Sequence, residues 1–482
     1  MKQESLKADI VIIGGGGAGL AAAVQAAENG KKVAILEKRH AVGGNTAMAH
    51  GFFAADSPVQ KRMMADAPKD VLFKLAMDYH HWTINPRLVR TYMNKSADTV
   101  SWLEAKGLKI VTVAVLNPNY TYRTFHMGEG PTGIIVVKLL AKNAADLGVT
   151  VYTKAAAKKI LLDTGGKVKG VLATTENGDV SIEAKSVIIT TGGYGGNKDL
   201  LQKYCPGYSY DDVNYLGLKD LTGDGLLMAI EAGAATEGMG MPHYWGGHYL
   251  GANSVNLVNQ RPEMIWVNKN GERFYDESLL FDMGLRGNIL ERQPGNVSFT
   301  IFDEKIKQSL TAEGLIGSQV ALRWSPPDIT WESVLSQLPG EVGKGYVKIA
   351  DSLNEIAGWM GAPPEVFKAT ISEYNVDCDK GYDSVFVKDR RYLQPLRNPP
   401  YYAVMFRQTL LDTMGGIKTN HRMEILDQDT RPIPGLYAAG VCVGGYQSAS
   451  YCYMLAGTMF GFSLNSGRIA ADNASRYVSS NK

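Results

Sequence analysis

A run of glycines near the amino terminus has the spacing of a turn that binds a dinucleotide. Gly14, Gly16 and Gly19 fit the pattern G-x-G-x-x-G within the segment GGGGAG. In this pattern the first glycine permits a tight turn, the second lets the backbone approach a pyrophosphate, and the third permits close packing of the following helix. Glu37 stands 18 residues past Gly19, where a carboxylate accepts hydrogen bonds from ribose hydroxyls.

The elements around this turn have the order that such a site requires. Residues 8–13 (ADIVII) are apolar and β-branched and predict a buried parallel strand. Residues 20–29 predict a helix that Gly30 ends, and residues 32–36 predict a second strand. The helix would offer unpaired N–H groups to the phosphates. The order predicts a dinucleotide site and leaves FAD and NAD both open, with a glycine-rich turn that binds nothing as the alternative.

Composition narrows the class of protein. The chain has 482 residues, enough for about three domain-sized units. It carries 50 Lys and Arg against 48 Asp and Glu, and this near-balance argues against a protein that binds nucleic acid or an acidic membrane. Glycine makes up 53 of the 482 residues, or about 11%, which is above the usual ~7%. The glycines cluster, which is typical of turns that hold a ligand.

Cysteine usage and apolar runs exclude further classes. The four cysteines show no C-x-x-C spacing, which argues against a zinc ribbon, an iron–sulfur cluster or an attached haem, and we expect no metal site. No apolar run reaches the ~20 residues that a membrane span needs. A short polar start of seven residues precedes the first strand without a secretory signal. We therefore expect a cytoplasmic protein without a membrane span.

Residues 37–55 (EKRHAVGGNTAMAHGFFAA) resemble the flavin segment of the fumarate reductase/succinate dehydrogenase flavoprotein superfamily. This superfamily also includes urocanate reductases and 3-ketosteroid dehydrogenases, and it favours FAD over NAD. The resemblance extends along nearly the whole chain. Further segments that match its motifs are residues 85–107, 186–197, 222–225 (TGDG), 267–277 (VNKNGERFYDE), 413–416 (TMGG) and 435–440 (GLYAAG).

The resemblance implies an α/β fold with a Rossmann-type FAD-binding domain, made of a parallel sheet plus a small β-sheet. Both chain ends would build this domain, from residues 1–238 and 411–482. An α+β capping domain would be inserted at residues 239–410. The substrate would lie between the cap and the flavin, a usual place for a ligand pocket.

The resemblance also implies a set of FAD contacts. Asn45 stands where succinate dehydrogenases carry a histidine that bonds covalently to FAD, so we expect non-covalent FAD. Val441 stands where relatives often carry a glutamate that holds the ribityl chain. The expected cofactor-binding residues are Gly14, Gly16, Ala18, Gly19, Glu37, Lys38, Gly44, Asn45, Thr46, Gly51, Ala157, Gly192, Asp224, Gly440, Met459 and Phe460.

The cationic groups with which fumarate reductases hold a dicarboxylate are replaced in this chain. Phe281 stands eight residues past Arg273, where relatives place an acid arginine. Asp412 replaces a histidine before the TMGG motif, and Met454 replaces a second arginine. Because Asp412 would repel a carboxylate, we do not expect reduction of fumarate, succinate or urocanate. Asp412 is a candidate catalytic residue, with a buried capping carboxylate as the other interpretation.

Two residues of the carboxyl-terminal segment fit the ketosteroid branch better. Tyr453 and Gly457 keep the spacing of a tyrosine four residues before a glycine. In that branch a phenol O–H and a backbone N–H converge on a substrate carbonyl oxygen and stabilise enolate charge, as an oxyanion hole does. The chain departs from the branch because residues 451–453 lack its proline and because Phe281 stands where a base tyrosine is expected. Tyr453 filling the core is the alternative.

The remaining candidates surround the same pocket. His50 stands where relatives have glycine and could relay a proton, or it could simply be packed. Tyr122 is a candidate catalytic residue in the loop NPNYTYR. Metal binding by His243 and His248 is disfavoured, since no carboxylate or cysteine neighbours them. The expected substrate-binding residues are Phe281, Tyr120, His243, Trp245, Tyr451 and Met454.

These residues predict an FAD-dependent oxidoreductase that acts on a CH–CH or C=C bond, or an adjacent C–O bond. The expected substrate is an uncharged cyclic carbonyl or phenol, similar to a steroid or an isoflavonoid. A reductase of small enoates that uses Arg123 or Arg261 as its clamp is an alternative, as is a non-catalytic FAD-binding protein. No second dinucleotide unit is visible in the sequence. Electrons would come from NAD(P)H at the flavin pocket or from a separate donor protein.

Overall fold

A computed structural model of the chain describes residues 6–116, 120–206, 208, 213–279, 282–313 and 329–481. The described residues form two large hydrophobic cores and two small hydrophobic clusters. The first core takes its residues from both ends of the chain, from Ile10 to Tyr244 and from Leu410 to Val478. The second core lies between Tyr249 and Phe406. The predicted domain boundaries at residues 238/239 and 410/411 lie outside this second core, with Tyr244 and Leu410 of the first core inside the predicted range, and they stay a prediction.

A parallel sheet forms the centre of the first body, in the strand order β20-β21-β11-β2-β3-β7. All neighbouring pairs are parallel except β20 with β21. The strands β2, β3 and β11 are wholly buried, as their unbroken β-branched sequences predict for a sheet covered on both faces. The strands are β2 (Ile10–Ile13), β3 (Val33–Leu36), β7 (Thr150–Tyr152), β11 (Ser186–Ile189), β20 (Glu424–Leu426) and β21 (Pro432–Ala438).

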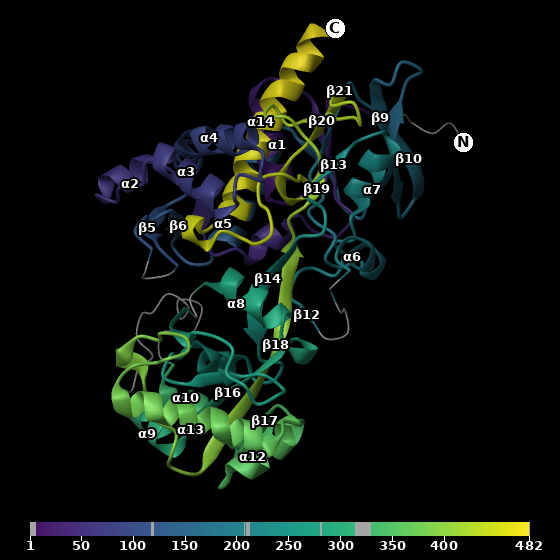
Figure 1. Ribbon diagram of the computed structural model, residues 1–482. Helices are drawn as coiled ribbons and strands as arrows, with labels where there is room; N and C mark the ends of the chain where they lie inside the picture. Colours follow the sequence, from purple (N-terminus) through teal and green to yellow (C-terminus); the bar gives the residue numbers. More distant parts are fainter. Residues whose placement is uncertain are drawn as a thin grey trace.

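Two helices from opposite ends of the chain pack together against this sheet. Helix α1 (Gly17–Glu28) follows the glycine turn, and α14 (Thr458–Ser480) lies beside it (Figure 1). A Cβ atom added at Gly19 would stand 1.9 Å from the carbonyl oxygen of Gly14. A Cβ added at Gly467 would stand 2.3 Å from that of Ala18. The third glycine of the turn therefore has the predicted packing role, and the helix pair ties the carboxyl-terminal segment to the turn.

Further helices and two small antiparallel or mixed sheets complete the first body. The helices are α2 (Pro58–Arg62), α3 (Lys69–Tyr79), α4 (Pro86–Ala105), α5 (Thr132–Asp146), α6 (Lys198–Tyr204) and α7 (Asp224–Glu231). One small sheet has the order β1-β10-β9-β8 and the other β4-β6-β5. Their strands, with a separate short pair, are β1 (Leu6–Lys7), β8 (Ala156–Leu162), β9 (Val168–Thr175), β10 (Gly178–Glu183), β4 (Phe52–Phe53), β5 (Ile110–Ala114), β6 (Phe125–Gly128), β13 (Thr236–Glu237) and β19 (Gly416–Ile417).

The second body is built on one long strand that runs toward the first body (Figure 1). Strand β18 (Tyr401–Thr413) pairs with β12 (Asn214–Tyr215), β14 (Pro242–His248), β16 (Val297–Asp303) and β17 (Val347–Ala350), and β15 (Ile265–Val267) pairs with β16. The helices are α8 (Met283–Glu291), α9 (Glu304–Glu313), α10 (Trp331–Leu335), α11 (Leu338–Glu341), α12 (Leu353–Met360) and α13 (Pro364–Lys380). Since β18 ends at the TMGG motif, its last residues reach the first body.

The motif VNKNGERFYDE forms a buried ionic cluster in the second body. Arg273 donates from Nη2 to Glu277 at 2.8 Å and to Asp383 at 2.7 Å. Lys388 lies 3.2 Å from the same Glu277 carboxylate, and both side chains are fully buried. A buried cluster of this kind holds charges only when each has a partner. Arg273 therefore stabilises the second body through its two buried ion pairs.

Within the described part of the chain, no helix combines the length and the apolar character that crossing a membrane requires.

Candidate active site

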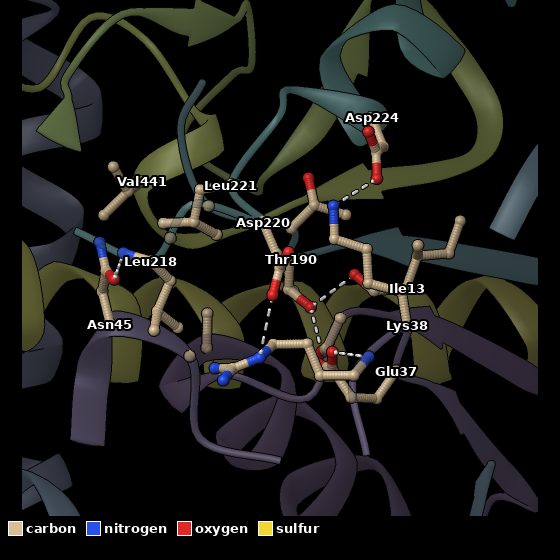
Figure 2. A pocket seen from close by; sticks show the side chains of 18 of the residues that line it. Ile13, Glu37, Lys38, Asn45, Thr190, Leu218, Asp220, Leu221, Asp224 and Val441 are labelled. Atoms are coloured by element: carbon tan, nitrogen blue, oxygen red, sulfur yellow. Dashed lines mark hydrogen bonds and ion pairs between the residues drawn. The ribbon is translucent and has the colours of Figure 1, made fainter. Parts of the chain in front are cut away.

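A groove opens where the parallel strands β2, β3 and β11 end. This is the edge at which open α/β sheets bind ligands. The glycine turn after β2 lines the groove, together with Glu37 after β3 and Thr190 after β11. Figure 2 shows the side chains of Glu37 and Thr190 in this groove. Most of the predicted cofactor residues line this groove: Gly14, Gly16, Ala18, Glu37, Lys38, Gly44, Asn45, Thr46, Ala157, Gly192, Asp224 and Gly440.

Glu37 is held in a fixed position beside the turn. Its Oε2 accepts a hydrogen bond from the Gly15 N–H at 2.8 Å, and its Oε1 accepts one from the Arg39 N–H at 2.9 Å. Lys38 pairs with Asp224 at 2.8 Å, as Figure 2 shows. The two backbone N–H groups hold the Glu37 carboxylate at the groove. Its remaining lone pairs can accept hydrogen bonds from ribose hydroxyls.

The groove fits a dinucleotide cofactor. A Cβ atom added at Gly16 would meet nothing within 4 Å, so the backbone there is open to a close ligand. Gly16 is also the N-cap of α1, and no side chain caps that helix end. The Thr191 hydroxyl lines the groove, buried and with no hydrogen-bond partner. A pyrophosphate at this helix end and a polar group near Thr191 would satisfy these positions.

Replacing Gly16 tests this fit. Gly16 has φ −76° and ψ −171°, an extended conformation that valine adopts without strain. We expect Gly16→Val to fold normally and to bind FAD about 10–100-fold more weakly, because the new side chain overpacks the pyrophosphate position by about 1–3 kcal/mol. FAD titration followed by flavin fluorescence measures the effect. Gly358→Val, also open within 4 Å but located in α12, should bind FAD normally, and equal affinities of the two variants would contradict the placement.

A second cavity, of about 590 Å³, continues from the groove. Asn45, Thr46, Asp412, Val441 and Ser463 line both spaces, so a cofactor in the groove would reach into the cavity. Neither Lys nor Arg occurs among the described residues that line it. They are Asn45, Thr46, Met48, Ala49, His50, Gly51, Leu116, Phe125, Leu216, His243, Trp245, His248, Asn253, Leu411, Asp412, Val441, Tyr451, Tyr453, Gly457, Met459, Phe460 and Ser463.

One wall of the cavity is aromatic. His243 stacks on Tyr451 with ring centres 4.5 Å apart, and Tyr451 meets Tyr453 edge to face at 4.8 Å. The Tyr453 hydroxyl lies 3.5 Å from Nε2 of His243. Burial lowers the pKa of His243 to about 3 and raises that of Tyr453 well above its ordinary value. At neutral pH the wall therefore presents a neutral imidazole and a protonated phenol, which are hydrogen-bonding groups without charge.

Asp412 lies at the junction of the groove and the cavity. Its side chain accepts hydrogen bonds from the Thr413 N–H at 2.9 Å and from the Asn45 amide at 3.0 Å. The Asn45 amide oxygen accepts the Leu218 N–H at 3.0 Å, which fixes the orientation of the amide. Asp412 is 2% exposed, and burial raises the pKa of its carboxyl to about 7. Near neutral pH this group is thus poised between acid and carboxylate.

The structure gathers most of the predicted site and places the rest elsewhere. Gly51, Met459 and Phe460 line the cavity, as do His50 and Gly457, whereas Gly19 serves packing. Besides Gly19, three of the predicted residues are not among the lining residues: Tyr120 donates to Asp282, and Tyr122 and Met454 pack against the first core. Phe281 lies outside the described residues.

The clamp arginines of the enoate alternative do not reach the cavity. Arg261 pairs with Glu263 at 2.9 Å and with Glu313 at 2.8 Å in the second body, and Arg123 is exposed. Neither is among the residues that line the cavity. A clamp built on these two arginines is therefore not supported.

Sequence reasoning missed several lining residues. Thr190 and Thr191 line the groove, and their place directly after a buried strand could have identified them. Leu116, Phe125 and Asn253 line the cavity but carry no local signal, because apolar residues and single amides are common in any fold.

Comparisons with known proteins agree with this geometry. Residues 9–452 match the family described as "FAD binding domain". Vinyl phenol reductase of Lactiplantibacillus plantarum is 31% identical, and the alignment covers 98% of this chain and 97% of that protein.

Two solved structures have the same fold. The open conformation of a flavocytochrome c3 fumarate reductase superposes with a TM-score of 0.74 at 26% identity, over 98% of this chain and 79% of that one. A 3-ketosteroid-Δ4-(5α)-dehydrogenase from Rhodococcus jostii superposes with a TM-score of 0.76 at 22% identity, over 98% of both chains, which shows the fold alone. With its sequence match over most of its length, this chain belongs to the FAD binding domain family and is an FAD-dependent oxidoreductase of the fumarate reductase-like flavoproteins.

Proposed function

We propose that this enzyme reduces a C=C bond conjugated with an uncharged, oxygen-bearing ring, with vinyl phenols as the substrate class. The observation that carries the proposal is the cavity beside the FAD groove, where the lining residues supply aromatic rings and neutral hydrogen-bonding groups but no Lys or Arg. The named activity of the 31% identical relative supports the same class. Steroid-like and isoflavonoid-like rings share its chemistry and form the wider class.

The charge of the cavity argues against acids as substrates. A carboxylate buried without a cation pays a desolvation cost of several kcal/mol. In this cavity it would also approach Asp412, whose ionised form repels it. An aromatic ring gains instead from edge-to-face and stacked contacts with the wall, worth about 0.5–1.5 kcal/mol for each ring pair.

The residues of the cavity fit the chemistry of a vinyl phenol. FAD bound in the groove that Asn45 lines would supply a hydride once it is reduced. Protonation of the vinyl terminus and loss of the phenol proton give a quinone methide, and hydride addition at the benzylic carbon returns an electron pair to the ring oxygen. Tyr453 would donate to that oxygen and stabilise its charge, as an oxyanion hole does. Gly457, which also lines the cavity, would add its backbone N–H.

In this proposal the cap of residues 239–410 closes the cavity from solvent through β14. The electrons come from outside the chain, either from NAD(P)H at the flavin or from a separate donor protein. Both sources leave the site of reduction unchanged, because they load the same cofactor.

Anaerobic reoxidation of the reduced holoenzyme tests the substrate class. The enzyme is loaded with FAD and reduced with a reduced viologen. Separate samples are then mixed with para-vinylphenol, an uncharged cyclic enone, fumarate or urocanate. We expect the uncharged rings to reoxidise the flavin and the two acids to leave it reduced. Preferential oxidation by fumarate would contradict the proposal, and reoxidation by none of them would favour a non-catalytic FAD-binding protein.

A further inference from the structure

Asp412 occupies a position that joins the cofactor to the substrate. It is the second-last residue of β18, and the β14 residue paired with it is His243. Asp412 lines both the FAD groove and the substrate cavity. A side chain at this junction borders the spaces for both the flavin and the substrate. It could therefore transfer a proton to the substrate that accepts a hydride from the flavin.

The hydrogen-bond partners of Asp412 are neutral. The Thr413 N–H and the Asn45 amide donate to its carboxyl group, and both remain neutral at any pH. These two hydrogen bonds favour the ionised carboxylate, but burial favours the neutral acid and outweighs them, so the pKa of Asp412 is raised. The Asp412 carboxyl can therefore gain or lose a proton when the charge nearby changes.

The ionisable groups around Asp412 allow its carboxyl group to gain or lose a proton. On the groove side, Lys38 is paired with Asp224 and Arg39 with Asp220 at 3.3 Å, while Glu37 is held by backbone N–H groups. The cavity side carries His50, His243 and His248, whose pKa values burial lowers, and Tyr451 and Tyr453, whose pKa values burial raises. Buried Tyr446 also interacts electrostatically with Asp412.

We propose that Asp412 takes up a proton when the bound flavin is reduced and delivers it to the substrate carbon that does not receive the hydride. The inference rests on the proposed function for the identity of that carbon, which is the vinyl terminus. Reduction would add negative charge to a flavin held in the groove that Asp412 lines, and a like charge favours the protonated carboxyl. Asp412 is thus the catalytic acid of the site.

Protons and electrons balance in this sequence. Two electrons and two protons enter the holoenzyme, one proton at the flavin ring and one at the Asp412 carboxylate. The electron pair leaves with the first proton as hydride to the benzylic carbon, and the Asp412 proton goes to the vinyl terminus. The phenol proton lost on the way returns to the ring oxygen. The substrate gains two hydrogens, and the Asp412 carboxylate and the oxidised flavin are restored.

The other lining groups are poor acids at neutral pH. The imidazoles of His50, His243 and His248 have lowered pKa values and carry no extra proton. Burial raises the pKa of the Tyr453 phenol, and the proposed function assigns its hydroxyl to the ring oxygen of the substrate. Asp412 is the carboxyl group among the described cavity-lining residues.

The pH dependence of the flavin midpoint potential tests the uptake step without any substrate. At pH values above the pKa of Asp412 in the oxidised enzyme and below its pKa in the reduced enzyme, we expect two protons to bind with two electrons. The equilibrium constant for reduction then falls about 100-fold per pH unit, which is ~59 mV for a two-electron couple. In Asp412→Asn the fall should be about 10-fold, or ~30 mV.

Asp282→Asn is the matched control. Asp282 is a buried carboxyl that caps α8 and lies outside both lining sets, so its replacement should keep the steeper slope. A wild-type slope of ~30 mV per pH unit would overturn the uptake step. This measurement needs no variant, so it tests the step even if Asp412→Asn does not bind FAD. Because no substrate is present, this result is independent of the substrate class.

A single turnover tests the delivery step. Reduced Asp412→Asn holoenzyme mixed with para-vinylphenol should reoxidise about 10²–10⁴-fold more slowly than the wild type, the usual effect of losing a general acid. An unchanged rate together with the steep wild-type slope would overturn delivery and leave only proton uptake.

Discussion

Tyr453→Phe is expected to lower the rate of substrate reduction by about 10²–10³-fold with FAD still bound, the scale of losing one oxyanion donor. The change removes the hydroxyl that lies 3.5 Å from His243 and leaves the aromatic wall in place. Rapid mixing of the reduced enzyme with para-vinylphenol measures the rate, and the flavin absorbance measures the occupancy.

Tyr92→Phe is the control for this prediction. Tyr92 is as buried as Tyr453 and meets Phe462 edge to face at 5.4 Å, but it lines neither the groove nor the cavity. Removal of its hydroxyl should therefore leave the rate unchanged. If Tyr453→Phe behaved like this control, Tyr453 would be a packing residue of the core and the oxygen of the substrate would have another donor.

The pyrophosphate end of the FAD groove could be predicted from the sequence because its parts are local, whereas Thr190, Asp224 and Gly440 join the groove from distant segments. The turn, the start of α1 and the end of β3 lie within the span from Gly14 to Glu37. Their geometry depends on glycine positions and on the alternation of strand and helix, which nearby residues determine. The structure places these residues along the groove as the motif requires.

The substrate cavity could be predicted only in part, because it joins segments that are far apart in the sequence. Met454 illustrates the difficulty. It follows Tyr453 in the 3-10 helix η9 (Tyr453–Leu455), where successive side chains point about 120° apart since three residues make one turn. Tyr453 therefore faces the cavity while Met454 packs against the first core. A motif position does not tell which way its neighbour points.

Tyr120 shows the same limit for long-range contacts. The sequence predicts it as a substrate-binding residue, yet its hydroxyl donates to Asp282, the N-cap of α8. This bond links the first body to the second beside the aromatic cluster of Tyr451 and Tyr453. The two residues are 162 positions apart in the sequence and meet only in the folded protein, so no local sequence pattern predicts this contact.

A negative charge on the substrate is expected to lower kcat/KM by at least about 10³-fold. The matched pair is para-vinylphenol and para-hydroxycinnamate, which share the phenol and the C=C bond and differ by a carboxylate. Burying that carboxylate without a cation costs several kcal/mol, and about 4 kcal/mol corresponds to 10³. Steady-state rates with a reduced viologen as donor give the ratio.

The methyl ester of para-hydroxycinnamate separates charge from size, because it is larger than the acid but neutral. If charge decides, the ester is reduced faster than the acid; if the cavity is too short for any substituent on the vinyl terminus, both fail together. Lowering the pH toward the acid's own pKa should partly recover its reduction, since the neutral form of the substrate avoids the desolvation cost. Efficient reduction of the ionised acid would mean that a cation reaches the cavity, and the assignment of the site to neutral rings would be wrong.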